Sequence, residues 1–143
     1  MQPWWRFRRG LTLGVRGIVL TIDEKLLLVR QSYAKGWHLP GGGVERGETL
    51  GRALARELSE EANIELDSPP RLHGVFSNGD AFPGDHVAVF LATDWRQTEP
   101  KKPDAEIRAA EFFHKDALPQ GTTPGTRRRL AEILDGAAVS EHW

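Results

Sequence analysis

The sequence predicts a mixed α/β fold, and three features of the chain lead to that expectation. Segments rich in leucine and β-branched residues, typical of strands, begin at Leu11. Two segments with the composition of helices are spaced among them, so the order is strands, helix, strands, helix. The length of 143 residues suits one hydrophobic core and is short for two. We therefore expect a single domain over residues 1–143.

The first two strands are expected at Leu11–Ile22 and Lys25–Gln31. Both segments are largely apolar, and the polar pair Asp23 and Glu24 between them predicts a β-hairpin. The segment that follows, Gly36–Gly47, is rich in glycine and is interpreted as a loop.

A helix is expected over Thr49–Ala62, which contains no proline. With about 100° between successive residues, one arc of this helix is expected to pack against the sheet. The members of that arc are Gly51, Leu54, Ala55, Leu58 and Ala62. The neighbouring arc carries Glu57, Glu60 and Glu61, spaced i, i+3 and i+4.

This acidic cluster has two interpretations. Arg56 lies four residues before Glu60, so part of the charge can be paired along a solvated helix face. Alternatively, three oxygen donors within one helical turn suit a hard divalent cation such as Mg²⁺ or Mn²⁺. The glycine run Gly41–Gly43 in front of the helix favours the second interpretation, because it lets backbone approach a ligand closely.

The second half of the chain predicts three more strands and a helix. Arg71–Asn78 and His86–Trp95 are expected to be strands on either side of an exposed loop, and the run VAVFLA predicts burial on both faces. After a polar connection, Ala110–His114 is expected to form a short last strand. The final helix carries start and stop signals at Thr123, Pro124 and Gly136.

Composition excludes several classes of function. The absence of cysteine removes disulfide frameworks, thiolate zinc sites and cysteine nucleophiles. With 19 basic and 20 acidic residues, the net charge of -1 offers no global field for gripping a nucleic-acid backbone. Nucleic acid is therefore disfavoured as a partner, and any polyanion bound is expected to be small.

The N-terminal segment superficially resembles a secretion signal. However, Arg16 interrupts its apolar stretch, no small-residue cleavage site precedes Asp23, and no run reaches the roughly 18 apolar residues of a membrane span. We therefore expect a cytoplasmic protein without a membrane partner. The basic cluster Arg6, Arg8 and Arg9 is interpreted as a solvated arm, although contact with an anion or with a second subunit of a homodimer stays open.

From Gly42 onward the chain resembles the Nudix box, G(x5)E(x7)REUxEExGU, in which U is aliphatic. The matching residues are Gly42, Glu48, Arg56, Glu57, Leu58, Glu60, Glu61 and Ile64. The non-aliphatic matches would arise by chance on the order of once in ten million windows. Asn63 stands where the family prefers glycine, and asparagine is the next best residue for a left-handed helix end. The lead-in WHLPGG and the pair Phe112–Phe113 downstream also resemble the family.

The resemblance implies a Nudix-type α/β/α sandwich around a mixed β-sheet and a MutT-like, metal-dependent pyrophosphohydrolase. In such enzymes water attacks phosphorus in the diphosphate linkage of a small nucleotide derivative. The implied ligands of Mg²⁺ or Mn²⁺ are the carboxylates of Glu57, Glu60 and Glu61 and the carbonyl of Gly41. Arg56 is implied to orient these carboxylates, and Glu48 to steady loop and helix through Arg56, while Gly42 belongs to the structural part of the box.

The general base is left open by the resemblance, because family members take it from the box or from a downstream loop. Glu106 is our first choice, with Asp104 and Asp80 as alternatives. For substrate contacts, Arg30 is a candidate for a phosphate, and Trp37 and His38 for the rest of the nucleotide. Further candidate lining residues are Asn78, Phe82 and His86.

Nothing in the sequence selects among nucleoside triphosphates, nucleotide sugars, ADP-ribose and dinucleoside polyphosphates as substrates. Two other functions stay open: a nucleotide-sensing module that does not cleave its ligand, and an RNA 5′-end pyrophosphohydrolase. The retained box glutamates disfavour the first, and the near-neutral charge disfavours the second. The isomerases that share the fold rely on a catalytic cysteine, which this chain lacks.

Overall fold

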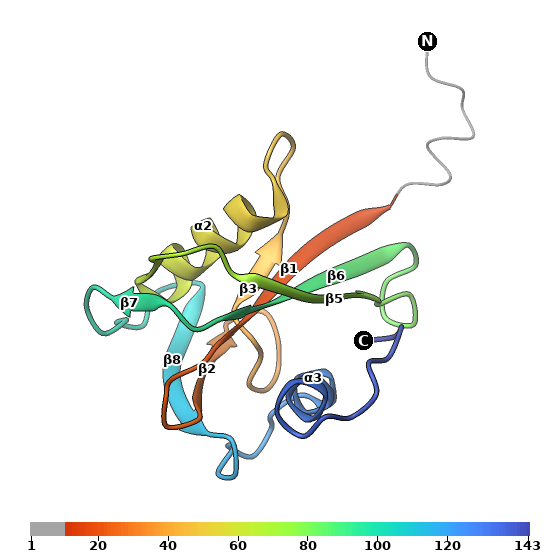
Figure 1. The fold of residues 1–143 in the computed structure, drawn as a ribbon. Coiled ribbons are helices and arrows are strands. Elements are labelled where there is room, and N and C mark those ends of the chain that lie inside the picture. Colours follow the sequence, from red (N-terminus) through yellow and green to blue (C-terminus); the bar gives the residue numbers. More distant parts are fainter. Residues whose placement is uncertain (1–10) are drawn as a thin grey trace.

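The largest sheet in the computed structural model, which describes residues 11–143, has four strands (Figure 1). Its strand order is β3 (Gly41–Gly43), β1 (Thr12–Val19), β6 (Asp85–Ala92) and β5 (Arg71–Ser77). β1 and β6 run parallel, whereas β3 pairs antiparallel with β1 and β5 antiparallel with β6. The sheet is therefore mixed, as the sequence predicts.

Two shorter antiparallel pairs complete the strands. β2 (Lys25–Gln31) pairs with β8 (Ile107–His114), and β4 (Ile64–Leu66) pairs with β7 (Trp95–Gln97). The expected strand His86–Trp95 thus ends at Ala92, and Trp95 begins a separate strand that the sequence pattern did not reveal.

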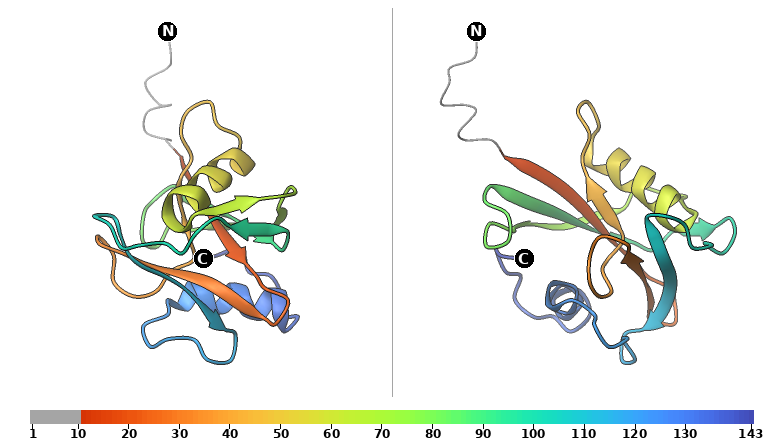
Figure 2. Two further views of the ribbon diagram at one scale, coloured as in Figure 1. Left: turned by 90° about the vertical axis from the view of Figure 1, so that its left-hand side faces the viewer. Right: turned by 180° about the vertical axis from the view of Figure 1, so that it is seen from behind.

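Two helices lie on opposite sides of the strands (Figures 1 and 2). The helix α2 (Leu50–Ala62) buries its apolar side against Val15, Val19 and Leu27, whereas α3 (Pro124–Leu134) places Leu130 in a second cluster with Ile18 and Phe76. Alternate residues of β1 therefore face different cores. This arrangement confirms the α/β/α class.

The predicted hairpin between the first two strands forms at its turn but does not continue as a ladder. Beyond the turn, β1 and β2 are joined only by an isolated bridge between Leu20 and Leu26, and β2 takes its ladder from β8. The reason lies in Leu26–Val29, which is fully buried with Leu27 in one core and Leu26 and Leu28 in the other. A strand that divides two cores needs cover on both faces, and its hydrogen-bonding partner is chosen by that packing rather than by the turn.

The glycine run predicted as part of a loop instead forms strand β3. A side chain at Gly41 is excluded, because its φ is 148° and a Cβ there would lie 1.9 Å from the carbonyl oxygen of Val15. At Gly42 a Cβ would lie 2.6 Å from Oε1 of Glu57. Glycine here therefore serves a close approach between strand and helix, and not flexibility.

The packed side of α2 also differs from the expected arc. Gly51 and Ala55 are only half-buried, whereas Ala53 and Glu61 lie in the buried face with Leu54, Leu58 and Ala62. The helix is rotated so that one of its glutamates faces the interior. Among residues 11–143, no helix is long and apolar enough to cross a membrane. The cluster Arg6, Arg8 and Arg9 lies outside the described residues.

Candidate active site

Local capping signals fix both ends of α2 and hence the direction of its acidic side chains. Thr49 is the N-cap, and its Oγ1 accepts the backbone N–H of Arg52 at 3.2 Å. Asn63 ends the helix in the left-handed conformation, with φ 56° and ψ 33°, and its N–H donates to the carbonyl of Ser59 at 3.1 Å. The substitution of the family's glycine by asparagine thus keeps the helix end that the sequence predicts.

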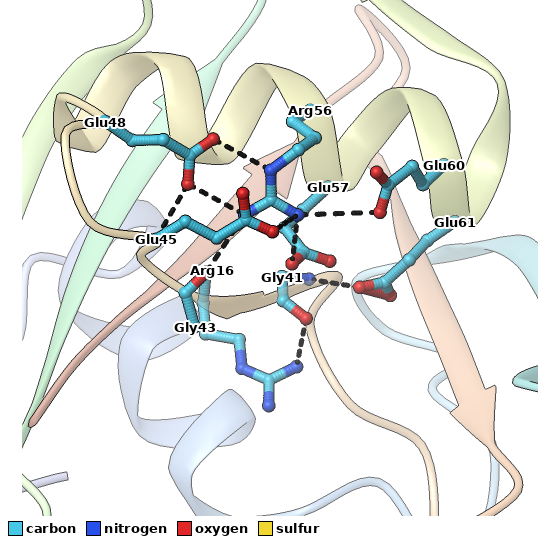
Figure 3. A network of polar contacts seen from close by, with 9 residues as sticks. All are labelled: Arg16, Gly41, Gly43, Glu45, Glu48, Arg56, Glu57, Glu60 and Glu61. Carbon is cyan, nitrogen blue, oxygen red and sulfur yellow. Dashed lines mark hydrogen bonds and ion pairs between the residues drawn. The ribbon is translucent and has the colours of Figure 1, made fainter.

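Arg56 connects the loop, β3 and α2 (Figure 3). Its Nε and Nη2 donate to the two carboxylate oxygens of Glu48 at 2.8 and 2.9 Å, and Nη2 also donates to the carbonyl of Gly43 at 3.1 Å. Its Nη1 donates to Glu57 at 3.0 Å and lies 3.5 Å from a carboxylate oxygen of Glu60. Bonds from Arg56 and from the backbone N–H of Glu45 lower the pKa of Glu48 to about 2.

Glu61 is the buried member of the acidic cluster. Only 5% of its surface is exposed, and its Oε1 accepts the backbone N–H of Gly41 at 3.2 Å. Its Oε2 is buried with no hydrogen-bond partner. Burial raises the pKa of Glu61 well above its usual range, and the hydrogen bond and charge of Glu57 raise it further. A buried carboxylate held beside a second one is the arrangement that a bound cation relieves.

A pocket of about 300 Å³, called the carboxylate pocket below, brings Glu57, Glu60 and Glu61 together with Glu106. Its lining residues are Gln31, Tyr33, Gly42, Gly43, Glu57, Glu60, Glu61, Glu106 and Ile107. Glu106 is held there by Asp104, whose carboxylate accepts the backbone N–H groups of Glu106 and Ile107 at 2.9 and 2.7 Å. These bonds and Lys101 lower the pKa of Asp104 to about 2, with Lys101 the larger cause.

The chemistry of this pocket fits a hard divalent cation. Within the described range, no group of three His, Asp or Glu side chains is arranged to hold a metal ion. Glu60 is paired with Arg56, and Glu61 accepts the backbone N–H of Gly41. The available donors are nevertheless all oxygen, and the partnerless Oε2 of Glu61 lies among them. The carbonyl of Gly41 accepts a hydrogen bond from Nη1 of Arg16 at 3.3 Å.

A larger pocket of about 610 Å³ adjoins the first and shares Gln31, Tyr33, Gly42 and Gly43 with it. Its wall is mainly apolar and aromatic, with polar groups at a few points, and includes Arg16, His38, Asn78, Phe82 and Trp143. The side chains of Tyr33 and Phe82 are exposed, as expected of a rim. Burial lowers the pKa of His38, whose Nε2 lies 2.7 Å from the Lys35 carbonyl.

Some predicted site residues lie apart from both pockets. Trp37 packs its ring edge-on against Phe113, with 4.9 Å between centroids, and lines neither pocket. Arg30 is exposed and stands over the ring of Trp37 at 5.7 Å. Asp80 and His86 also line neither pocket, whereas His38, Asn78 and Phe82 line the larger one.

Two residues of the site escaped the sequence interpretation. Arg16 was noted only as an interruption of an apolar run, yet it donates to the carbonyls of Leu39 and Gly41. Gln31 ends β2 with only 4% of its surface exposed, although its side chain is polar. The available clue was its alternation with Arg30, which places Gln31 on the same face as Val29.

A protein-family model described as NUDIX domain matches residues 11–133. This chain belongs to the NUDIX domain family. The match covers the box, the lead-in and the downstream acidic loop, and it confirms the resemblance that these motifs indicate.

Several known proteins are similar to this NUDIX chain. It is 36% identical over 118 residues to the NAD-capped RNA hydrolase NudC of Pectobacterium atrosepticum, an alignment that covers 80% of this chain and 44% of the relative. It is 34% identical over 106 residues to the ADP-ribose pyrophosphatase of Methanocaldococcus jannaschii, which covers 71% and 62% respectively. The chain thus spans about half the length of these curated relatives.

Among solved structures, a MutT NUDIX hydrolase from Burkholderia pseudomallei matches with a TM-score of 0.75 and 32% sequence identity. The match covers 87% of this chain and 98% of that one. The sandwich of Figure 1 is therefore the fold of a known NUDIX structure.

Proposed function

We propose that this chain is a Mg²⁺- or Mn²⁺-dependent pyrophosphohydrolase that cleaves the diphosphate linkage of a small nucleotide derivative. The observation that carries the proposal is the pocket in which buried Glu61, its neighbour Glu57 and the distant Glu106 meet. The printed activities of the relatives, an ADP-ribose pyrophosphatase and an NAD-capped RNA hydrolase, share the chemistry of a diphosphate linkage to a nucleoside.

The proposed metal ligands are the carboxylates of Glu57, Glu60 and Glu61 and the carbonyl of Gly41. A divalent ion bound by them would neutralise the diphosphate and make a bound water more acidic. Arg56 acts as a positioning residue, because its guanidinium holds the Glu57 carboxylate while Glu48 holds the guanidinium. Arg16 fixes β3 beside these oxygens through the carbonyls that it binds.

Glu106 is the proposed general base. It lines the carboxylate pocket, and its position is set by the turn around Asp104. Asp104 is less suited to the role, since its own carboxylate is already engaged by two backbone N–H groups and by Lys101. Glu106 would accept the proton of the attacking water, which leaves hydroxide to attack phosphorus.

The larger pocket is proposed to hold the nucleoside. Its apolar wall and the exposed rings of Tyr33 and Phe82 suit a flat aromatic base, and it opens beside the carboxylates where the diphosphate would lie. The alternative of a sensor that binds without cleavage is disfavoured, because all the box glutamates are retained.

The test is a phosphate-release screen of the full chain with Mg²⁺ or Mn²⁺ against nucleoside triphosphates, oxidised nucleotides, nucleotide sugars, ADP-ribose and dinucleoside polyphosphates. A phosphatase is added where the product needs unmasking. We expect one preferred class and loss of activity with chelator. Glu61→Gln should reduce turnover about 100-fold or more while the protein stays folded, because it removes a ligand charge and relieves burial of a carboxylate.

If no compound of the panel releases phosphate but nucleotide still binds, the chain is a nucleotide sensor and not a hydrolase. Full activity of Glu61→Gln would overturn the metal assignment.

A further inference from the structure

Gln31 is a buried amide whose hydrogen-bonding atoms have no partner among the described residues. Only 4% of its surface is exposed, and both Nε2 and Oε1 lack a hydrogen bond. It is the last residue of β2 and lies on the buried face of the strand, opposite exposed Arg30. Gln31 lines both the carboxylate pocket and the larger pocket, so it stands where the two meet.

An unpartnered buried amide is costly, because it gives up hydrogen bonds to water and gains none in return. Apart from Oε2 of Glu61, other buried polar side chains of the described residues avoid that cost: Thr122 donates to the Pro119 carbonyl, and Glu132 accepts from Arg129. The same residue type is satisfied elsewhere, since Gln97 donates to the carbonyl of Ala62 at 3.0 Å. Retaining an unsatisfied glutamine at the junction of two pockets indicates a ligand that completes its bonds.

The chemistry of the missing partner follows from the two free atoms. Nε2 needs an acceptor and Oε1 needs a donor. Phosphate oxygens at neutral pH accept but offer almost no donor, so a phosphate would leave Oε1 unsatisfied. A hydroxyl group both donates and accepts. In a nucleotide, the sugar lies between the phosphates and the base, which is the place of Gln31 between the two pockets.

We propose that Gln31 binds a sugar hydroxyl of the nucleotide and thereby distinguishes ribose from a deoxyribose. The inference rests on the proposed function, since it assigns the carboxylate pocket to the diphosphate and the larger pocket to the nucleoside. Tyr33, which lines both pockets beside Gln31, is the neighbouring side chain that would flank the sugar.

The experiment measures binding with Mg²⁺ by calorimetry, so that no turnover is needed. The probes are the α,β-methylene diphosphates of adenosine, guanosine, cytidine and uridine, each as the ribonucleoside and as its 2′-deoxy and 3′-deoxy forms. The variant is Gln31→Leu, which keeps the volume and removes both polar atoms. Gln97→Leu is the matched control, because it removes an amide that is already bonded.

For the wild type we expect about 10-fold weaker binding of at least one deoxy form, as the loss of one or two hydrogen bonds would give. Gln31→Leu should lose this discrimination and bind that deoxy form as the wild type does. It should also melt at the same or a higher temperature, because the unsatisfied amide is gone. Gln97→Leu should melt lower and keep the discrimination.

Three outcomes overturn the inference. If Gln31→Leu weakens the binding of the ribo, 2′-deoxy and 3′-deoxy probes equally, the Gln31 amide contacts the phosphate or the metal and not the sugar. If Gln31→Leu melts at a lower temperature, as Gln97→Leu is expected to, the role of Gln31 is structural. Failure of the wild type to bind any probe, or to discriminate between ribose and deoxy forms, would remove the sugar contact. If sugar discrimination is seen but the screen detects no hydrolysis, the proposed catalysis fails while the role of Gln31 stands.

Discussion

Three glutamates within one turn of α2 occupy three different environments. Glu57 accepts from Arg56 at 3.0 Å, Glu60 is exposed and lies 3.5 Å from the same guanidinium, and Glu61 is buried with one free oxygen. Glu45 and Glu48 join Glu57 and Glu60 around Arg56, so the carboxylates outnumber the one guanidinium group that they contact (Figure 3). Residual negative charge is what a site for a divalent cation requires.

The variant Glu106→Gln tests the proposed general base. We expect kcat to fall about 100-fold or more with little change in KM, because a base contributes to proton transfer and not to ground-state binding. Glu111→Gln is the matched control, since Glu111 is an exposed glutamate of the adjoining strand β8 outside the pocket. Steady-state kinetics on the substrate found by the screen give both constants. If Glu106→Gln turns over at a rate near that of the wild type, the general base is a residue of the Nudix box and not Glu106.

At the scale of elements, local signals predicted the helices but not the partners of the strands. Thr49 and Asn63 mark the two ends of α2, and Thr123 with Pro124 marks the start of α3. These ends could be predicted because caps depend on a few neighbouring residues. Strand pairing depends on distant packing, so the pairing of β2 with β8 was missed, as was the strand formed by Gly41–Gly43.

The residues of the candidate site also divide into those that the sequence predicted and those that it did not. The spacing of the box places its glutamates on one side of α2, and the resemblance supplied Glu106. Gln31 was missed because its burial depends on distant segments that pack around the end of β2, and the local hydrophobic pattern does not show them. Trp37 was a candidate for the substrate, and its contact with Phe113 could not be predicted from a sequence that separates the two by about half of the chain.

The junction between the β3–α2 loop and the helix should depend on pH through Glu48. Its pKa falls from 4.5 to about 2 on folding, so the stabilisation by the Arg56 pair is fully present above pH 4.5 and is lost as the pH falls toward 2. Glu48→Gln should lower the melting temperature by a few degrees at pH 7, and the difference from the wild type should shrink at pH 3. Glu45→Gln is the control, because the Glu45 carboxylate is more exposed and lies 3.8 Å from Arg56.

Thermal melts of the wild type and both variants at pH 3, 5 and 7 measure this. A difference between wild type and Glu48→Gln that is constant from pH 7 to pH 3 would contradict the assignment of the pair.

At the scale of the whole molecule, a buried arginine joins the last helix, the sheet and the C-terminal residues. Arg129 is completely buried, donates to both carboxylate oxygens of Glu132 at 2.9 Å and lies 3.8 Å over the ring of Phe76 in β5. Its Nη1 also donates to the carbonyls of His142 and Trp143, at 3.2 and 3.1 Å. Since Trp143 lines the larger pocket, one guanidinium supports both the fold and a wall of the candidate site. The C-terminal segment returns beside β5 in the views of Figures 1 and 2.

Arg129→Met should therefore lower stability and loosen the pocket together. Methionine keeps the unbranched apolar stem but leaves the buried Glu132 carboxylate with only His73 and the backbone N–H of Ser140 as partners. Removing one partner of a buried ion pair costs about 3–5 kcal/mol. Arg127→Met on the exposed side of the same helix is the control and should change stability by less than about 0.5 kcal/mol. Urea unfolding measures both, and the double variant Arg129→Met with Glu132→Leu should recover part of the loss, because the buried carboxylate is removed with its guanidinium partner. A loss for Arg129→Met no larger than that of the control would show that the guanidinium is not what holds the C-terminal segment in place.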